Sequence, residues 1–562
     1  MNTYYTEFFE KGQQKINFNL YQIGLPSDDP VFTLKKVLED LNYASLLEKY
    51  SHQGRKGYNP IMLFAVLVYA NMRGVKAIDR IVELCRRDIA FIWLTGGLKP
   101  GRDVFYEFIK YRLTGEILSG LHYQFMRRLQ KEGLVSLKAL FIDGTKIEAN
   151  ANRYTFVWRG SINYHLANLL DQIKTLYASY NALLKSCGYG NKYGFCEEEM
   201  LVIEGIERVK IVIEKNRNRK LHGEKKVPNK AIITIENCSP LELLKLQTNL
   251  TTIAKGEEIL FTVSKGQRKS ELQKLYEAIE SCGERLMKYK NHFEIMGADR
   301  NSYSKTDFEA TFMRMKDDHM RNGQLKPAYN AQISTENQII VNYTIHQQTN
   351  DFNTLEHHLK NFEKLYGEKR LAELEELTAD AGYGSEQNYE LLEQNNITPY
   401  VKYNTFDKEQ DAHYQAKHKT FSKENLHYNQ EKDYYVCAMG QKMEKTHEST
   451  RKTKTGYPQK LSHYQAKNCD GCPIRGVCHS SKENRSIERN HHLEDYKEKI
   501  RKLLNSEKGI KKRKQRSVEV EPVFAHLKHC NNFKRFTLKG LKKVELEFGL
   551  HALAHNLRKK VA

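Results

Sequence analysis

The sequence has no apolar run long enough to cross a membrane. Its longest apolar stretch, "IMLFAVLVYANM", runs from Ile61 to Met72, whereas a spanning helix needs about 20 apolar residues. The opening "MNTYYTEFFEKGQQK" lacks the basic region and apolar core of a secretory signal. We therefore expect neither export nor a membrane partner.

Cysteine is scarce as well. Ten cysteines in 562 residues do not form the dense pattern of a disulfide-stabilised scaffold. Six of the ten are scattered along the chain and are typical of small apolar fillers. The cysteine content therefore favours a reducing, cytoplasmic environment.

Acidic residues are too few to balance the basic ones. The chain has 90 Lys and Arg against 69 Asp and Glu, a formal charge of +21. Such a surplus favours a polyanionic partner, because it otherwise repels itself. The basic residues are spread over the whole chain, whereas a membrane-surface protein more often concentrates them in one amphipathic helix. Nucleic acid is the expected partner, and a merely soluble basic protein is the alternative.

Helix-start signals dominate the first 134 residues. Asp28 or Asp29 is expected to cap a helix with Pro30 in its first turn. Asn59 and Pro60 predict a second helix start of the same kind. Several short helices with basic tips follow. They are compatible with a DNA-binding bundle and equally with a plain helical domain.

Two predicted strands end at an acid. The apolar run Leu137 to Ile142 stops at Asp143, and the run before "DAGYGSEQ" stops at Asp380. If these strands are neighbours in one sheet, the two carboxylates lie side by side and repel each other unless a cation is bound. Mg²⁺ takes such oxygen ligands, and two such ions can drive phosphodiester cleavage. The alternative is that each Asp forms a turn or caps a helix.

A third carboxylate is expected from a helix packed on the sheet. In "RSVEVEPVFAHLKHC", Val520, Phe524 and Leu527 form an apolar stripe, and Glu521 lies on the adjacent face. Glu519 is the rival candidate. A Glu on an amphipathic helix is otherwise usually just solvated.

The ordered set of motifs resembles one known family. The segments are "GRKGYNPIMLFAVLVYANMRG", "FIDGTKIEANANRYTF", "KPAYNAQISTENQIIV", "LTADAGYGSEQNYELL" and "VEPVFAHLK" with "LHALAHNLRK". Together they resemble insertion-sequence transposases of the Asp-Asp-Glu type from bacteria, which have a ribonuclease-H-like core. The similarity touches nearly all of the chain in the expected order.

The resemblance implies that Asp143, Asp380 and Glu521 are a catalytic triad that binds two Mg²⁺ (or Mn²⁺) ions. It also implies that Lys528, seven positions after Glu521, contacts a DNA phosphate. In "DAGYGSEQ", Gly382 and Gly384 then let the chain turn sharply without a side chain crowding the metal.

The chain departs from the family pattern before Glu521. Related transposases often have Tyr seven positions and Arg four positions before that Glu, where this sequence has Lys514 and Ser517. The nearest arginine is Arg516. We expect Arg516 and Lys146 to contact DNA.

A compact group of cysteines is the remaining motif. Cys469, Cys472 and Cys478 follow one another closely, and Cys437 precedes them. Four thiolates suit a closed, structural Zn²⁺ site, with His479 as a spare ligand. Reduced thiols in a polar loop are the alternative.

The expected fold is a ribonuclease-H-like mixed sheet with flanking helices. A helical insertion and a cysteine-containing insertion interrupt it, and an all-α domain precedes it. The segments are a helical DNA-binding domain (1–134), a first core part (135–155), a helical insertion (156–325), a second core part (326–404), a polar insertion with the cysteines (405–507) and C-terminal core helices (508–562).

The expected function is DNA transposition. The enzyme would cleave double-stranded DNA at the terminal inverted repeats of its element and join the 3′ hydroxyls to target DNA, as a homodimer in a synaptic complex. It would be cytoplasmic and nucleoid-associated. The alternatives are a non-catalytic DNA-binding protein derived from a transposase and a nuclease of the same fold.

Overall fold

A computed structural model describes residues 24–50, 57–196, 240–262, 267–297, 300–315, 323–410, 421–453, 455–479, 481 and 483–561. Its contacts group into two compact units. One unit combines Met1–Glu148 with Tyr329–Ala562, and the other is Ala149–Ala328. No helix within the described ranges is long and apolar enough to span a bilayer.

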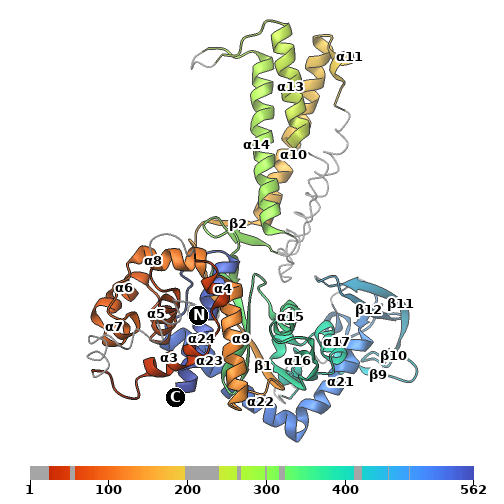
Figure 1. Ribbon diagram of the computed structural model, residues 1–562. Helices are drawn as coiled ribbons and strands as arrows, with labels where there is room; N and C mark the ends of the chain where they lie inside the picture. The colour runs from red at the N-terminus through yellow and green to blue at the C-terminus, as the bar shows by residue number, and fades with distance from the viewer. Residues whose placement is uncertain are drawn as a thin grey trace. The chain divides into compact units, whose positions relative to one another are not determined.

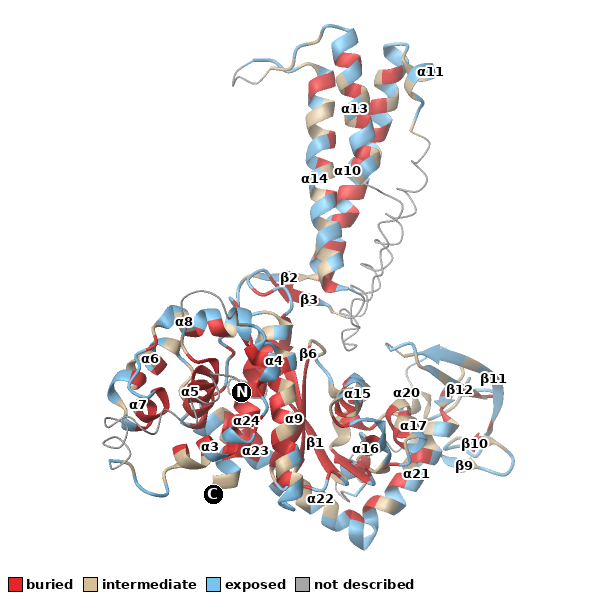
Figure 2. Cartoon of the chain, in the orientation of Figure 1, coloured by how far each residue is buried: buried red, intermediate tan, exposed pale blue. Residues whose placement is uncertain are grey.

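Short helices begin the first unit: α3 Pro30–Glu39, α4 Ala44–Leu47, α5 Pro60–Met72, α6 Ile78–Arg87, α7 Ile89–Thr95, α8 Arg102–Glu107, η2 Phe108–Arg112 and α9 Gly115–Lys131. The Asp29 carboxylate accepts the N–H of Val31 at 2.9 Å, and Asn59 caps α5. Both predicted helix starts are thus confirmed. All 13 residues of α5 are buried (Figure 2), because α3, α7 and the C-terminal helix pack around it.

A mixed sheet forms the centre of this unit (Figure 1). Its strands are β1 Ala139–Glu148, β5 Leu325–Glu336, β6 Ile339–His346, β7 Glu376–Ala379 and β8 Thr398–Val401. The order is β5-β1-β7-β8, with β6 antiparallel on β5. β1, β7 and β8 are parallel neighbours. The predicted α/β class with a ribonuclease-H-like mixed sheet and an N-terminal helical region is confirmed.

A tight two-residue turn connects β5 and β6. Asn337 and Gln338 connect the strands, and both have positive φ, 54° and 63°. Two such residues in succession suit the right-handed twist of a hairpin. The chain therefore reverses direction at these two residues and pairs β6 with β5.

Helices cover the sheet and connect its strands. Between β6 and β8 they are η4 Asp351–Asn353, α15 Leu355–Tyr366, α16 Glu368–Ala372, η5 Ala381–Tyr383 and α17 Glu386–Gln394. After β8 they are α18 Phe406–Glu409, η6 Lys423–Asn425, α20 Arg475–Cys478, α21 His491–Asn505, α22 Glu507–Glu519, α23 Glu521–Ala525, η7 His526–Cys530 and α24 Leu541–Val561. Helix α24 packs against α5, α9 and β6, and α22 packs against β7 and β8. One hydrophobic core therefore joins the N-terminal helices to the sheet.

The polar segment with the cysteines contains a sheet that the sequence analysis did not predict. Its strands are β9 His427–Asn429, β10 Tyr434–Val436, β11 Lys442–Lys452, β12 Pro458–Ala466 and β13 Ser486–Arg489, in the antiparallel order β13-β12-β11-β10-β9. We call this sheet with α20 the cysteine module. Most of β11 is exposed, so no alternation of apolar residues marks it.

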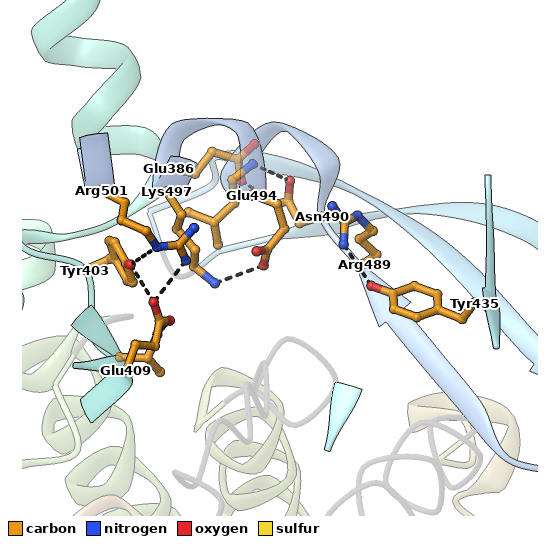
Figure 3. Close-up of polar contacts among 11 residues, drawn as sticks. Glu386, Tyr403, Glu409, Tyr435, Arg489, Asn490, Glu494, Lys497 and Arg501 are labelled. Atoms are coloured by element: carbon orange, nitrogen blue, oxygen red, sulfur yellow. Dashed lines mark hydrogen bonds and ion pairs between the residues drawn. The ribbon is translucent and has the colours of Figure 1, made fainter. Parts of the chain in front are cut away.

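Polar side chains join the cysteine module to the core through α21 (Figure 3). Asn490, which caps α21, donates to the buried carboxylate of Glu386 in α17 at 2.6 Å. Further along α21, Arg501 donates to Glu409 at 2.9 Å. On the module side, Arg489 donates to the Tyr435 hydroxyl at 2.9 Å.

The described part of the second unit contains the helices α10 Arg159–Ser186, α13 Pro240–Gly256 and α14 Glu271–Met296, with the short α11 Gly190–Tyr193. α14 packs against both α10 and α13 around a separate hydrophobic core. Its strands are β2 Phe156–Trp158, β3 Ser302–Ser304 and β4 Thr311–Arg314, where β2 pairs with β3 and β4 pairs with residues 325–328 of β5.

Candidate active site

The parallel pairing of β1 and β7 places two acids side by side. The last paired residues are Ile142 and Ala379, so Asp143 and Asp380 follow at equivalent positions. β1 itself continues to Glu148. The expectation that this strand ends at Asp143 was therefore wrong, and what ends there is its ladder with β7.

Asp143 is a buried carboxylate with an arginine partner. Its side chain is 9% exposed, and its Oδ2 lies 3.3 Å from Nη1 of Arg516. Its Oδ1 accepts the N–H of Gly144 at 2.8 Å. The negative charge is thus held inside the protein with a cation and a backbone donor, as a buried charge requires.

Asp380 begins a turn that only glycines allow. Its Oδ1 accepts the N–H of Gly382 at 2.8 Å. A Cβ on Gly384 would lie 2.8 Å from the Cα of Tyr403 and closer still to the carbonyl oxygen of Lys402. Ser385 then caps α17 by accepting the N–H of Asn388. Close backbone approach is therefore the reason for the sharp turn after Asp380.

Glu521 and Glu519 lie in different environments. Glu521 opens α23, its side chain is 58% exposed, and its Oε1 lies 3.5 Å from Nη2 of Arg516. Glu519 is 6% exposed, and its Oε2 accepts the N–H of Gln338 in the β5–β6 turn at 2.8 Å. Glu519 thus supports the hairpin, while Glu521 shares an arginine with Asp143.

Arg516 contacts both Asp143, in β1, and Glu521, in α23. One guanidinium nitrogen faces Asp143 and another faces Glu521. A cation between two carboxylates relieves their mutual repulsion. In this structure the guanidinium therefore performs locally the electrostatic task of a bound cation.

The other predicted DNA-contacting residues lie near the same strand. Nζ of Lys528, in η7, donates to the carbonyl oxygen of Lys146 in β1 at 3.0 Å. Lys146 is three residues beyond Asp143. The structure thus brings the positive charge of Lys528 to the strand that carries Asp143.

One acid of this region escaped the sequence analysis. Asp351 opens η4, between β6 and α15. Its Oδ1 accepts from Asn330 Nδ2 at 2.7 Å and from Gln332 Nε2 at 2.9 Å. The signal was available, because Asp351 follows a strand and precedes a helix as Asp380 does.

Three carboxylates lie close enough to the Tyr383 hydroxyl to affect its pKa. Burial, followed by the charges of Asp351, Asp143 and Asp380, raises the pKa of its hydroxyl well above the usual value. The neutral hydroxyl donates to the Oε1 of Gln332. Negative charge therefore gathers where β1 and β7 separate.

The cysteine module brings its four cysteines to one cavity. Cys437, Cys469, Cys472 and Cys478 line a space of about 300 Å³ together with His479. N–H groups point at three of the sulfurs: Gln441 N to Cys437 at 3.3 Å, Arg485 N to Cys469 at 3.4 Å and Arg485 Nη1 to Cys478 at 2.6 Å.

The imidazole ring of His479 lies in the same cavity. Both of its ring nitrogens are buried and have no partner among the described residues. Burial lowers the pKa of His479, so the ring is neutral at neutral pH, the form that binds metals.

Within the described ranges, no group of three or more His, Cys, Asp or Glu side chains is already arranged to hold a metal ion. At the carboxylates, the guanidinium of Arg516 stands between two of the acids. Metal binding at either place would therefore require side chains to move.

Two family models match the sequence. Residues 436–561 match a model described as "Transposase DDE domain", and residues 20–110 match "Transposase domain (DUF772)". The first match contains Glu521, Lys528 and the four cysteines of the module, and the second covers the N-terminal helices from α3 to α8. No curated protein and no solved structure matches the chain.

Proposed function

Because the chain belongs to the insertion-sequence DDE transposases and is therefore a DNA-processing enzyme, we propose that it cleaves the ends of its element and joins the 3′ hydroxyls to target DNA. The reacting phosphate would be held at Asp143, Asp380 and Glu521. The observation that carries this proposal is the register of β1 and β7, which sets Asp143 beside Asp380, with Glu521 linked to Asp143 through Arg516.

The residues at this position fit Mg²⁺ or Mn²⁺. Carboxylate oxygens are the ligands that these ions prefer. Gly382 keeps the space beside the acids open, since a Cβ on Gly382 would lie 2.8 Å from Oδ1 of Asp380. Two such ions activate the attacking oxygen and stabilise the leaving oxygen in phosphoryl transfer.

The protein's own groups then bind and orient the DNA. Asp143 and Asp380 would hold the cations on the sheet, and Glu521 would add a ligand from α23. A cation held by Asp143 and Glu521 would replace the guanidinium of Arg516 and free it for a DNA phosphate, where arginine binds strongly. Lys528 and Lys146 would contact the backbone beside it. Such contacts carry no sequence information and weaken with salt.

The partner of the reaction is double-stranded DNA, which the transposase families bind in general. We propose that the terminal inverted repeats and the target DNA are the two substrates. Joining requires both element ends in one complex, so the active form would be a homodimer. The charge of +21 supports polyanion binding.

The test compares cleavage by matched variants. Purified protein, Mg²⁺ and DNA that carries the terminal repeats should give cut and joined products. Asp143→Asn and Asp380→Asn should abolish cutting and leave DNA binding largely intact, whereas Asp407→Asn, at an exposed acid of α18, should behave as wild type. Cutting by either site variant would refute the assignment. Cut products without joining would identify a nuclease of the same fold, and binding alone would identify a DNA-binding protein.

A second proposal concerns the cysteine module, which we infer to bind a structural Zn²⁺ ion through Cys437, Cys469, Cys472 and Cys478, with His479 as a spare ligand. Three observations support it: the shared cavity, the N–H groups aimed at sulfur and the partnerless ring nitrogens of His479. N–H donors of this kind stabilise metal-bound thiolates. Zinc would hold the module folded.

Metal analysis after dialysis tests the zinc proposal. The wild type should retain about one Zn²⁺ per chain, as a single closed four-thiolate site requires. Cys472→Ser should lose the zinc and unfold at a lower temperature. Cys187→Ser, at an exposed cysteine of the second unit, is the control and should keep it. Wild-type protein without zinc would end the proposal.

A further inference from the structure

Asp351 and Asp380 approach each other beside Gly382. A Cβ on Gly382 would lie 2.8 Å from Oδ1 of Asp380 and 3.3 Å from Oδ2 of Asp351. A Cβ on Gly144 would lie 2.8 Å from Oδ1 of Asp351. Both carboxylates therefore lie beside Gly382 at the edge of the sheet, while the amide of Gln332 fills the place beside Gly144.

Asp351 is held in place by buried amides. Asn330 and Gln332, 1% and 0% exposed, both donate to its Oδ1. Gln332 also donates to Asn330 Oδ1 at 3.1 Å and accepts from the Tyr383 hydroxyl. This chain of hydrogen bonds fixes one oxygen of Asp351 and leaves Oδ2 directed toward Gly382.

The charges at the site are unevenly compensated. Arg516 pairs with Asp143 and Glu521. Within the described ranges, no Lys, Arg or His forms an ion pair with Asp351 or Asp380. Two nearby carboxylates without a counter-ion repel each other. A divalent cation between them removes that repulsion.

We propose that Asp351 is a fourth carboxylate of the active site and that, with Asp380, it binds a divalent cation before any cation displaces Arg516. The inference rests on the proposed function and names a residue that the triad does not contain. Asn330, Gln332 and Tyr383 are its positioning residues. The absence of a side chain at Gly382 would leave room for the ion beside the two carboxylates.

Mn²⁺ binding without DNA measures this step directly. Free and bound Mn²⁺ are distinguished by electron paramagnetic resonance on the full-length protein. Asp351→Asn should weaken the tighter Mn²⁺ site by roughly tenfold or more, since losing even an outer partner of a metal site costs that much. The metal-free Tm should stay equal or rise, because a repulsion is removed. Asp407→Asn is the matched control.

A second variant fills the proposed ion space without changing charge. Gly382→Ala places a methyl group against both carboxylates, and it should weaken Mn²⁺ binding as Asp351→Asn does. Wild-type Mn²⁺ affinity in Asp351→Asn would overturn the inference. A lower metal-free Tm with unchanged affinity would show a purely structural Asp351 and overturn it too.

The two proposals fail separately. If Asp380→Asn weakens Mn²⁺ binding and abolishes cutting while Asp351→Asn does neither, the triad stands and the fourth carboxylate falls. If Asp143→Asn and Asp380→Asn still cut DNA, the proposed function itself is refuted, whatever the result for Asp351.

Discussion

Replacing Arg516 should reveal that its guanidinium and a metal ion compete for one position. In Arg516→Gln, Asp143 remains 9% exposed in its side chain but loses the charge that stood 3.3 Å away. The perturbation is therefore the removal of one partner from a largely buried ion pair, which leaves a carboxylate without full compensation.

The magnitude follows from the distance and the exposure. Unit charges 3.3 Å apart attract by about 5 kcal/mol at an effective dielectric constant of about 20. The cost of desolvating the pair offsets much of that, and the Arg516 side chain is itself 20% exposed. We expect a loss of about 2 kcal/mol without metal, because one partner stays in contact with water. A loss of that size lowers Tm by about 4 °C or more in a domain of ordinary size.

Adding Mn²⁺ should reverse the loss. In the wild type a cation must displace the guanidinium, whereas in Arg516→Gln the position is free. The rise in Tm on adding Mn²⁺ should therefore be larger in the variant, since a ligand stabilises the state that it binds more tightly. Scanning fluorimetry measures both effects, with Lys514→Gln on the same helix as the charge-matched control. If Arg516→Gln melts like the wild type and gains no more from Mn²⁺, the reasoning is refuted.

Two further predictions concern stability. Gly384→Ala should lower the free energy of unfolding by about 1–3 kcal/mol, because the new Cβ would meet backbone atoms of Tyr403. Urea titration measures this loss, with Gly120→Ala as the control, because nothing lies within 4 Å of a Cβ there. Equal stability of the two variants would contradict the prediction. Burial lowers the pKa of His122 and His555 to about 4. These rings bind protons more readily when unfolded, so their contribution is present above about pH 6.5 and is lost as the pH falls toward 4; urea midpoints that do not decline over that range would contradict it.

The positions of Asp143 and Asp380 next to strands could be predicted from nearby residues. Asp143 follows an apolar run and Asp380 follows a strand-like run, and the sequence alone placed both next to predicted strands. Their adjacency required the strand order, which depends on pairing between residues more than 200 positions apart. Periodicity describes only local structure. From the sequence alone, the two acids could be placed side by side only on the assumption that their strands are neighbours.

Asp351 and the cysteine module show what local signals miss. A lone Asp before a helix is most often a cap or turn former, and only the tertiary approach of Gly144 and Gly382 distinguishes Asp351 from one. The module's strands are largely polar because β11 is exposed over most of its length. Strands that bury little apolar surface leave almost no hydrophobic pattern.

The choice between Glu519 and Glu521 also depended on tertiary structure. Both lie on the same stretch of chain, two residues apart. The hairpin turn at Gln338, which approaches from a distant part of the sequence, donates to Glu519, which also accepts from Gln515 on its own helix. The break between α22 and α23 then turns Glu521 toward Arg516.

The contacts of Glu386 make the cysteine module inseparable from the core. This carboxylate is 3% exposed and accepts from Gln459, Asn490 and His492, all supplied by β12 and the start of α21. Excising the module to obtain a minimal enzyme would remove one donor to Glu386, Gln459, and cut the chain directly before another, Asn490. A shortened chain would therefore hold the segment from Asp380 to Glu386 less firmly.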